Sequence, residues 1–171
     1  KGVEEMFPER PQIHIEKTTL EKIANIIGIA SIVAMVLYIA FNWSALPENV
    51  PIHFNAAGEA DGWGSKWMLF FLLIITIALY IFMEVIERRP YTHNYPVRLT
   101  EQNAAQLYKE SCQTVNLIKN IVTIMLAYIT IRSVLVALGK VQGLGIVTMG
   151  VFLLIIGFVI IRSMVRMSKI Q

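Results

Sequence analysis

The hydrophobic positions of this chain are gathered into long runs, and polar stretches separate the runs. The four runs cover residues 23–43, 67–86, 115–138 and 144–161. The third run is the weakest, because Lys119, Asn120 and Arg132 interrupt it. A bilayer core about 30 Å thick is crossed by roughly 17–25 helical residues, and runs of this length are too long for the strands of a membrane barrel. The pattern therefore predicts an all-α integral membrane protein with four transmembrane helices.

Local start and stop signals place the boundaries of these elements. Thr18 and Glu21 have the spacing of a capping box, Thr100 has the position of a second N-cap, and Pro90 and Pro96 keep the chain between them extended. The expected order is a cytoplasmic tail (1–18), a first span (19–43), a cap loop (44–66), a second span (67–88), a cytoplasmic loop (89–100), a long helix containing the third span (101–138), an outer turn (139–144) and a fourth span (145–166). We expect a single membrane domain over 1–171.

Charge gives the orientation of the spans. The chain is 56% hydrophobic and only 16% charged, whereas soluble domains carry about 25% charged residues. With a cytoplasmic N-terminus, twelve Lys and Arg residues lie on the inner side and only Lys66, Arg132 and Lys140 on the outer side. This bias follows the positive-inside rule and predicts both termini in the cytoplasm. Because the bases are spread over the membrane flanks, we expect the lipid bilayer as a partner and no nucleic acid.

Two further features concern the cell compartment. Acidic residues precede the first run, which is longer than the apolar part of a signal peptide, so we expect it to stay in the protein as a signal-anchor. Cys112 is the single cysteine, and it falls on the expected cytoplasmic, reducing side. We therefore expect no internal disulfide.

The stretch LPENVPIHFNAAGEADGWGSK, at 46–66, is polar between two apolar runs. The residues expected to fix its shape are Pro47, Pro51, Gly58, Gly62, Trp63, Gly64 and Lys66. Proline restricts the backbone, and the glycines of Ala57-Gly58 and Asp61-Gly62 are typical of turns. The stretch is therefore expected to be an ordered extracytoplasmic cap between the first two helices.

Within this cap, the segment VPIHF alternates between apolar and other residues. The alternation places Val50, Ile52 and Phe54 on one face of a short strand or extended strip. Trp43 and Trp67, at the two ends of the loop, suit the aromatic belt at a membrane interface. These positions predict a cap that lies directly on the outer ends of the helices.

The cap stretch resembles the signature of the domain-of-unknown-function 1648 family, which also forms the N-terminal part of SdpI-type membrane proteins. The matching positions are Leu46, Pro47, Val50, Pro51, His53, Phe54, Gly58, Asp61, Gly64 and Lys66. The later stretches NYPVRLTEQNAAQLYKESCQTVNLIK and LAYITIRSVLVALG are also similar to stand-alone members of this family. The resemblance implies a protein of the bacterial plasma membrane, and an SdpI-like role in immunity to a toxic peptide or in signalling.

His53 is the cap residue with the widest range of chemistry. With Asn55, Glu59 and Asp61 it is a candidate for binding a ligand or for sensing pH. Alternatively, His53 donates a hydrogen bond that pins the loop, while Asp61 caps a turn or pairs with a base. A metal or proton site is the third alternative. Because zinc usually takes three or four protein ligands and His53 is the only histidine expected outside, we expect no metal and no cofactor.

Arg132 lies inside the predicted outer boundary of the third span. A charge at this depth reaches the interface, finds a partner or lines a wet cavity. Helical spacing places Arg132 on the same face as Tyr128, so we expect both to point toward the cap. We predict that Arg132 pairs with Asp61 or Glu59 beneath the loop, and a substrate or anion site is the alternative.

Polar residues also gather at the inner ends of the second and third runs. Glu84 and Arg88 have the spacing of a helical ion pair, which is ordinary for a membrane flank. Lys119 marks the inner boundary of the third span, and Asn25 and Asn120 are expected to bond other helices. The sequence has no phosphate loop, nucleophile motif or recognisable pair of buried carboxylates, so we expect no enzyme.

The expected function is non-enzymatic binding or sensing, or an immunity-like role, in which the cap meets an extracellular peptide or a protein partner. The alternative is a structural or accessory subunit of a membrane complex, or a small transporter. Small residues favour close helix packing and form two faces, namely Gly28, Ala30, Ser31 and Ala34 in the first span and Gly145, Gly150 and Gly157 in the fourth. Their neighbour can be the same chain or another copy in a homo-oligomer.

Overall fold

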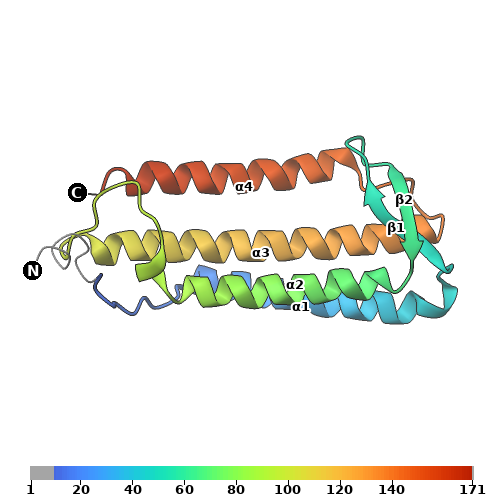
Figure 1. The fold of residues 1–171 in the computed structure, drawn as a ribbon, viewed down its shortest axis with the longest axis horizontal. Coiled ribbons are helices and arrows are strands. Elements are labelled where there is room, and N and C mark those ends of the chain that lie inside the picture. Colours follow the sequence, from blue (N-terminus) through green and yellow to red (C-terminus); the bar gives the residue numbers. More distant parts are fainter. Residues whose placement is uncertain (1–9, 171) are drawn as a thin grey trace, which may run out of the picture.

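The computed structural model describes residues 10–170 as one elongated bundle of helices with a small hairpin at one end (Figure 1). The elements are α1 (Thr19–Asn42), η1 (Trp43–Ala45), β1 (Asn49–Phe54), β2 (Ala60–Ser65), α2 (Met68–Glu87), η2 (Pro90–Thr92), α3 (Ala104–Ala137) and α4 (Ile146–Met167). Each of the four α-helices is long and apolar enough to cross a membrane. The expected tail at 1–18 is described only from residue 10, and its first nine residues lie outside the described part.

The two ends of the bundle differ in character. The strands β1 and β2 lie at one end with the turn between α3 and α4, which we call the hairpin end (Figure 1). The segment at 10–18, the connection between α2 and α3 and the end of α4 lie at the other, which we call the terminal end (Figure 1).

Helix α3 is the centre of the bundle. It packs against α1, α2 and α4, whereas α4 has no comparable contact with α1 or α2. The buried side chains of α3 recur every three or four residues and are mostly small or polar, as at Ser111, Asn116, Thr123, Ala127 and Thr130. Small side chains let the helix backbones approach closely. Most large apolar side chains of α1, α2 and α4 point outward instead, as in helices that face lipid.

The loop between α1 and α2 is an ordered hairpin, in which β1 and β2 pair as a two-stranded antiparallel sheet. The fold is therefore mostly helical, as predicted, with a small sheet added, and β1 is the short strand that was one of the two alternatives for VPIHF. The expected alternation along VPIHF is wrong, however. Val50 and Pro51 are both buried, while Ile52 and His53 are both exposed. The pairing with β2 shifts register between Pro51 and His53 and again before Phe54, and such a bulge re-aims the side chains on either side of it.

The buried side of the hairpin closes the end of the bundle. Val50 and Leu46 belong to one apolar cluster with Met35 and Ile39 of α1, Leu69 of α2, and Ala127 and Val134 of α3. The ring of Trp43 lies 5.0 Å from both Trp67 and Phe70, measured between centroids. This cluster fixes the two ends of the hairpin against α1 and α2.

Helix starts follow the capping signals at one of two sites. Helix α1 begins after Thr18, and the capping box with Glu21 is present, as predicted. The helix expected from residue 101 begins instead at Ala104. Thr100 and Asn103 exchange side-chain hydrogen bonds with each other's backbone N–H groups, so residues 101–103 form a turn before the helix.

The two helix faces of small residues differ in whether they pack against another helix. A Cβ atom at Gly28 would lie 2.2 Å from Oδ1 of Asn120, so this glycine lets α1 approach α3 closely. At Gly150 and Gly157 a Cβ atom would meet nothing within 4 Å. The expected close packing of α4 through these glycines does not occur within the described chain.

Candidate functional site

The tip of the hairpin is a rigid turn built around Asn55. Its side-chain Oδ1 accepts hydrogen bonds from the backbone N–H groups of Ala57, at 2.9 Å, and Glu59, at 3.0 Å. This is an Asx turn, and the Asn55 amide also donates to the Glu59 carboxylate at 3.1 Å. Gly58 completes the turn with a φ of +79°, a conformation that suits glycine.

The turn between α3 and α4 holds this tip through backbone contacts. Leu144 donates its N–H to the carbonyl of Gly58 at 2.8 Å, and Glu59 forms an antiparallel bridge with Gly143. A Cβ atom at Gly143 would lie 2.1 Å from the Gly58 carbonyl oxygen, so only glycine fits here without displacement. Segments that are more than eighty residues apart are thus joined into one surface.

Arg132 supports this joint from below, but the predicted ion pair is wrong. Its guanidinium donates from Nε, at 2.7 Å, and from Nη2 to the carbonyl of Gly143, instead of reaching Asp61 or Glu59. Tyr128 lies on the same helix face, as expected, and donates its hydroxyl to the carbonyl of Leu144 at 2.6 Å. The backbone of the outer turn, instead of a carboxylate, therefore holds Arg132 in place.

Asp61 is engaged by His53 across the hairpin. The His53 Nδ1 and Asp61 Oδ1 atoms lie 2.5 Å apart, with side chains 71% and 44% exposed. This contact fits the alternative in which His53 pins the loop, with Asp61 as its partner. At the base of the hairpin, Lys66 bonds the Glu48 carboxylate at 3.0 Å and its ammonium lies 5.1 Å from the centre of the Trp43 ring. Both pairs hold the hairpin and leave its outer surface open.

An open cleft of about 580 Å³ lies between the hairpin and the outer turn. Its lining residues are Ala57, Gly58, Glu59, Ala60, Trp63, Arg132, Val136, Gln142, Gly143 and Gly145. The cleft combines a carboxylate, a guanidinium, a side-chain amide and the exposed indole of Trp63. His53, Asn55 and Asp61 are not among the lining residues, so the structure divides the predicted site residues into two groups.

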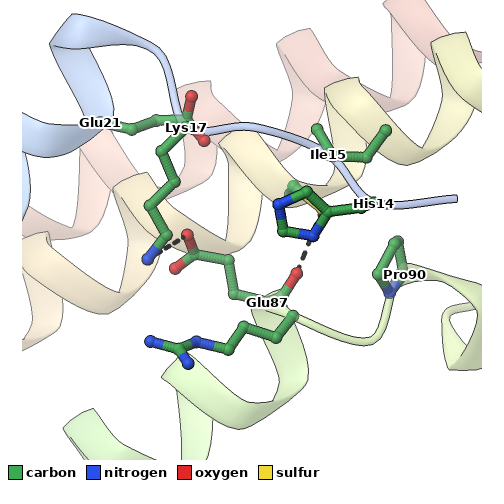
Figure 2. Close-up of a pocket in the computed structure, with 8 residues that line it drawn as sticks. His14, Ile15, Lys17, Glu21, Glu87 and Pro90 are labelled. Carbon is green, nitrogen blue, oxygen red and sulfur yellow. Dashed lines mark hydrogen bonds and ion pairs between the residues drawn. The ribbon is translucent and has the colours of Figure 1, made fainter.

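A second polar region lies at the terminal end, beneath the segment at 10–18. A cavity of about 280 Å³ lies there between this segment, the first turn of α1, the end of α2 with the start of η2, and the third turn of α3. Figure 2 shows the segment with His14 and Ile15 passing over Glu87, toward which Lys17 points. The floor of the cavity includes Cys112, which donates its thiol hydrogen to the Glu87 carbonyl at 3.1 Å.

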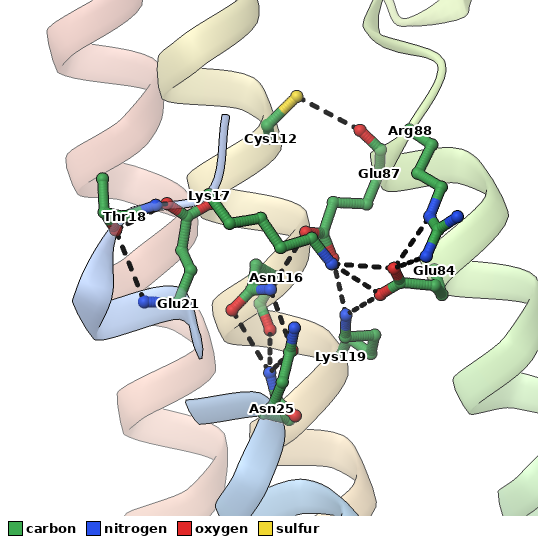
Figure 3. A network of polar contacts seen from close by, with 11 residues as sticks. Lys17, Thr18, Glu21, Asn25, Glu84, Glu87, Arg88, Cys112, Asn116 and Lys119 are labelled. Carbon is green, nitrogen blue, oxygen red and sulfur yellow. Dashed lines mark hydrogen bonds and ion pairs between the residues drawn. The ribbon is translucent and has the colours of Figure 1, made fainter. Parts of the chain in front are cut away.

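Glu84 and Glu87 of α2 share two ammonium groups in this region (Figure 3). Lys119 of α3 contacts Glu84 at 2.5 Å and Glu87 at 2.6 Å, and its side chain is fully buried. Lys17 contacts the same two carboxylates at 2.7 and 2.9 Å. The predicted helical ion pair between Glu84 and Arg88 is present at 2.9 Å. The two lysines add contacts that the sequence did not predict, and they join Glu84 to the buried carboxylate of Glu87.

Three asparagines extend this network toward the hairpin end. Asn25 of α1 accepts hydrogen bonds from the amides of Asn116 and Asn120 of α3, both at 2.9 Å. Asn116 also donates to Glu87 at 3.0 Å. These contacts confirm the predicted interhelical bonds of Asn25 and Asn120 and link three helices through one polar cluster.

Sequence spacing carried a usable signal for this cluster. Glu84 and Glu87 are three residues apart, and Asn116, Lys119 and Asn120 recur at three and four, so each set lies on one helix face. The signal was missed because the two sets could equally have faced lipid headgroups. Lys17 had no periodic pattern, since it precedes the helix.

The two sites differ in what they can do chemically. Burial lowers the pKa of Lys17, but its hydrogen bonds to Glu84 and Glu87 raise the pKa by more, so Lys17 stays protonated. Within residues 10–170, no three or more His, Cys, Asp or Glu side chains are grouped to hold a metal ion. The hairpin end offers an open surface of mixed polarity, and the terminal end offers an enclosed ionic pocket.

The family comparison covers the cap. Residues 30–77 match the model of a family described as a domain of unknown function (DUF1648). This match confirms the resemblance of the cap stretch to this family, and it runs from the middle of α1 through the hairpin into α2. No curated protein and no solved structure matches the chain. The hairpin therefore lies within the matched domain, and the description of the family names no activity.

Proposed function

We propose, taking the match of residues 30–77 to the DUF1648 family as the premise, that this chain is a non-enzymatic, multi-pass membrane protein whose cap recognises an extracellular peptide. The cap is the β1–β2 hairpin together with the turn between α3 and α4. The observation that carries this proposal is the cleft of about 580 Å³ between these two parts.

The orientation that this function needs follows from charge. Among residues 10–170, Lys66, Arg132 and Lys140 lie toward the hairpin end, whereas the other eleven Lys and Arg residues lie toward the terminal end. Positively charged flanks stay in the cytoplasm. The hairpin end is then extracytoplasmic, and both termini are cytoplasmic, in the plasma membrane of a bacterium if the family resemblance extends to the source.

The chemistry of the cleft suits a peptide. Arg132 has five N–H groups, and those beyond its two bonds to Gly143 are available to a carboxylate. Glu59 offers the opposite charge, and the indole of Trp63, 54% exposed, offers an apolar surface. Exposed aromatic and arginine side chains are the residues that most often dominate binding at protein interfaces. The backbone joint between hairpin and turn holds these groups in place before binding.

The proposal is tested with the full chain in lipid nanodiscs. The nanodiscs are incubated with the peptides found in the culture medium of cells that express the protein. A peptide identified by mass spectrometry should bind the wild-type protein, and Trp63→Ala should weaken it about tenfold or more, as for a residue central to an interface. Ile52→Ala is the matched control, because Ile52 is exposed on the same hairpin but does not line the cleft. Retention of no peptide above empty nanodiscs, or equal binding by Trp63→Ala, contradicts the proposal.

An accessory-subunit function is the second candidate, and α4 supports it. Helix α4 packs against α3 and has no comparable contact with α1 or α2. Its Gly150 and Gly157 face open space. Glycines at helix interfaces favour close association in membranes. The test is a photo-crosslinker placed at Phe158, which is exposed on α4. Capture of one defined membrane protein at this position, together with no capture at the cap, would favour this function over peptide recognition.

A further inference from the structure

One ammonium in the terminal cluster does not come from the helical bundle. Lys17 belongs to the segment at 10–18, which has no regular secondary structure, and yet it contacts Glu84 at 2.7 Å and Glu87 at 2.9 Å. Its side chain is 25% exposed, whereas that of Lys119 is fully buried. The two carboxylates therefore hold one permanent ammonium from α3 and a second that enters from outside the bundle.

The shielded charges of this cluster require a cation at the position of Lys17. Glu84 and Glu87 are 20% and 2% exposed, and Lys119 alone neutralises one of their two charges. Arg88 also contacts Glu84, but its side chain is 72% exposed and is screened by water. Since an unpaired charge is costly away from water, a ligand that replaces Lys17 must carry a positive charge itself.

The cavity beside Lys17 supplies room for such a ligand. It measures about 280 Å³ and is lined by His14, Ile15, Lys17, Glu21, Glu87, Arg88, Pro90 and Cys112. The wall formed by His14, Ile15 and Lys17 is the segment at 10–18 itself (Figure 2). Glu21 adds a third carboxylate to the lining, although it also accepts bonds from Thr18. Among the remaining lining residues, Glu87 offers a carboxylate, and Pro90 and Cys112 offer apolar surface to an alkyl chain. The fourth, Arg88, is basic, but its exposed guanidinium is paired with Glu84.

The segment has few attachments beyond Lys17. Arg10 donates to the carbonyls of Tyr91, at 3.0 Å, and His93, at 2.6 Å, and both bonds are exposed to solvent. Segments with exposed hydrogen bonds and no secondary structure open at low free-energy cost. Lys119 has no comparable freedom, because it lies in the middle of α3.

We propose that Glu84 and Glu87 form a binding site for the primary ammonium of a small aliphatic amine, and that Lys17 is its built-in, displaceable occupant. The ligand's ammonium takes the place of the Lys17 Nζ between the two carboxylates, and its chain lies in the cavity that the segment covers. The site is independent of the cap, since it lies at the opposite end of the bundle (Figure 1).

The single cysteine reports directly on this site. Cys112 lines the cavity and is 5% exposed, so its reaction with N-ethylmaleimide measures how often the segment moves away. In the full chain, Lys17→Ala should speed this reaction by about tenfold, whereas Lys17→Arg should leave it near the wild-type rate because the charge is kept. Lys22→Ala is the matched control, since Lys22 is an exposed base one turn away.

Cadaverine, a small diamine, is the ligand probe. It should slow the labelling of Cys112 in Lys17→Ala by several-fold at saturation, and it should have no such effect in Lys17→Ala/Glu87→Gln, which lacks one carboxylate of the site. Labelling of Lys17→Ala at the wild-type rate, equal acceleration by Lys22→Ala, or labelling that cadaverine does not change overturns the proposal.

A second measurement needs no substitution and so does not depend on how the variants fold. In the wild-type protein, saturating cadaverine should displace Lys17 and increase tryptic cleavage after this residue several-fold. Pentanol, which lacks the ammonium, is the control; added from an ethanol stock at the same concentration, it should leave the cleavage unchanged. Cleavage that responds to neither compound, or to both equally, overturns the proposal as well.

Discussion

At the scale of single residues, the cap depends on close approach more than on charge. Gly143 lies against the Gly58 carbonyl, and Arg132 and Tyr128 hold the outer turn by its backbone oxygens. Every one of these contacts uses a main-chain group. The cap can therefore keep its shape while the side chains around its cleft are free to meet a ligand.

Gly143→Ala tests this joint. The added methyl group would lie 2.1 Å from the Gly58 carbonyl oxygen, so the hairpin tip must move away from the turn. We expect the free energy of unfolding in detergent to fall by about 1–3 kcal/mol, the usual cost of overpacking, and the tip to become more sensitive to protease.

Gly150→Ala is the control for this substitution. Open space surrounds Gly150 in α4, and alanine favours a helix over glycine by roughly 0.5–1 kcal/mol, so stability should be unchanged or slightly raised. If both variants unfold alike, the joint at Gly143 does not stabilise the cap.

At the scale of elements, the terminal cluster joins α2 to α3. Lys119 reaches across to Glu84 and Glu87, and its ammonium lies 5.0 Å from the centre of the Tyr80 ring. Asn116 and Asn120 tie α1 to the same face of α3 through Asn25. The three helices are therefore held at this end by polar contacts, whereas apolar packing holds them at the hairpin end.

Lys119→Met should separate these elements at the terminal end. The substitution keeps most of the volume but removes the buried ammonium from two carboxylates, and breaking a buried pair in this way costs about 3–5 kcal/mol. Thermal unfolding in detergent should show the loss. Lys109→Met on the exposed face of α3 should change stability little, and equal effects of the two substitutions would show that the cluster contributes nothing special.

The elements themselves could be predicted from the sequence, and their mutual contacts could not. Apolar runs of sufficient length predict four spans, and Thr18 with Glu21 predicts the start of α1. The bulge in β1 depends on its pairing with β2, so the pattern of VPIHF alone gave the wrong faces. The prediction that Arg132 points toward the cap is correct. Its partner could not be predicted, because every residue has a backbone carbonyl and the sequence does not distinguish that of Gly143 from the others.

At the scale of the whole molecule, the bundle separates two kinds of chemistry. The hairpin end carries an open cleft beside an ordered backbone joint, and the terminal end carries an enclosed ionic cavity beneath the segment at 10–18. The two proposals assign an extracellular peptide to the first and a small amine to the second. Both depend on the bundle crossing the membrane with these ends on opposite sides.

The most direct measurement is the labelling of single cysteines in intact cells with a membrane-impermeant maleimide, in a Cys112→Ser background. Gln142→Cys lies on the exposed outer turn, and Ser168→Cys lies just after α4; neither substitution changes the charge bias that sets orientation. The account predicts that Gln142→Cys reacts in intact cells and that Ser168→Cys reacts only after permeabilisation. Reaction of Ser168→Cys in intact cells, with Gln142→Cys protected until permeabilisation, would contradict it.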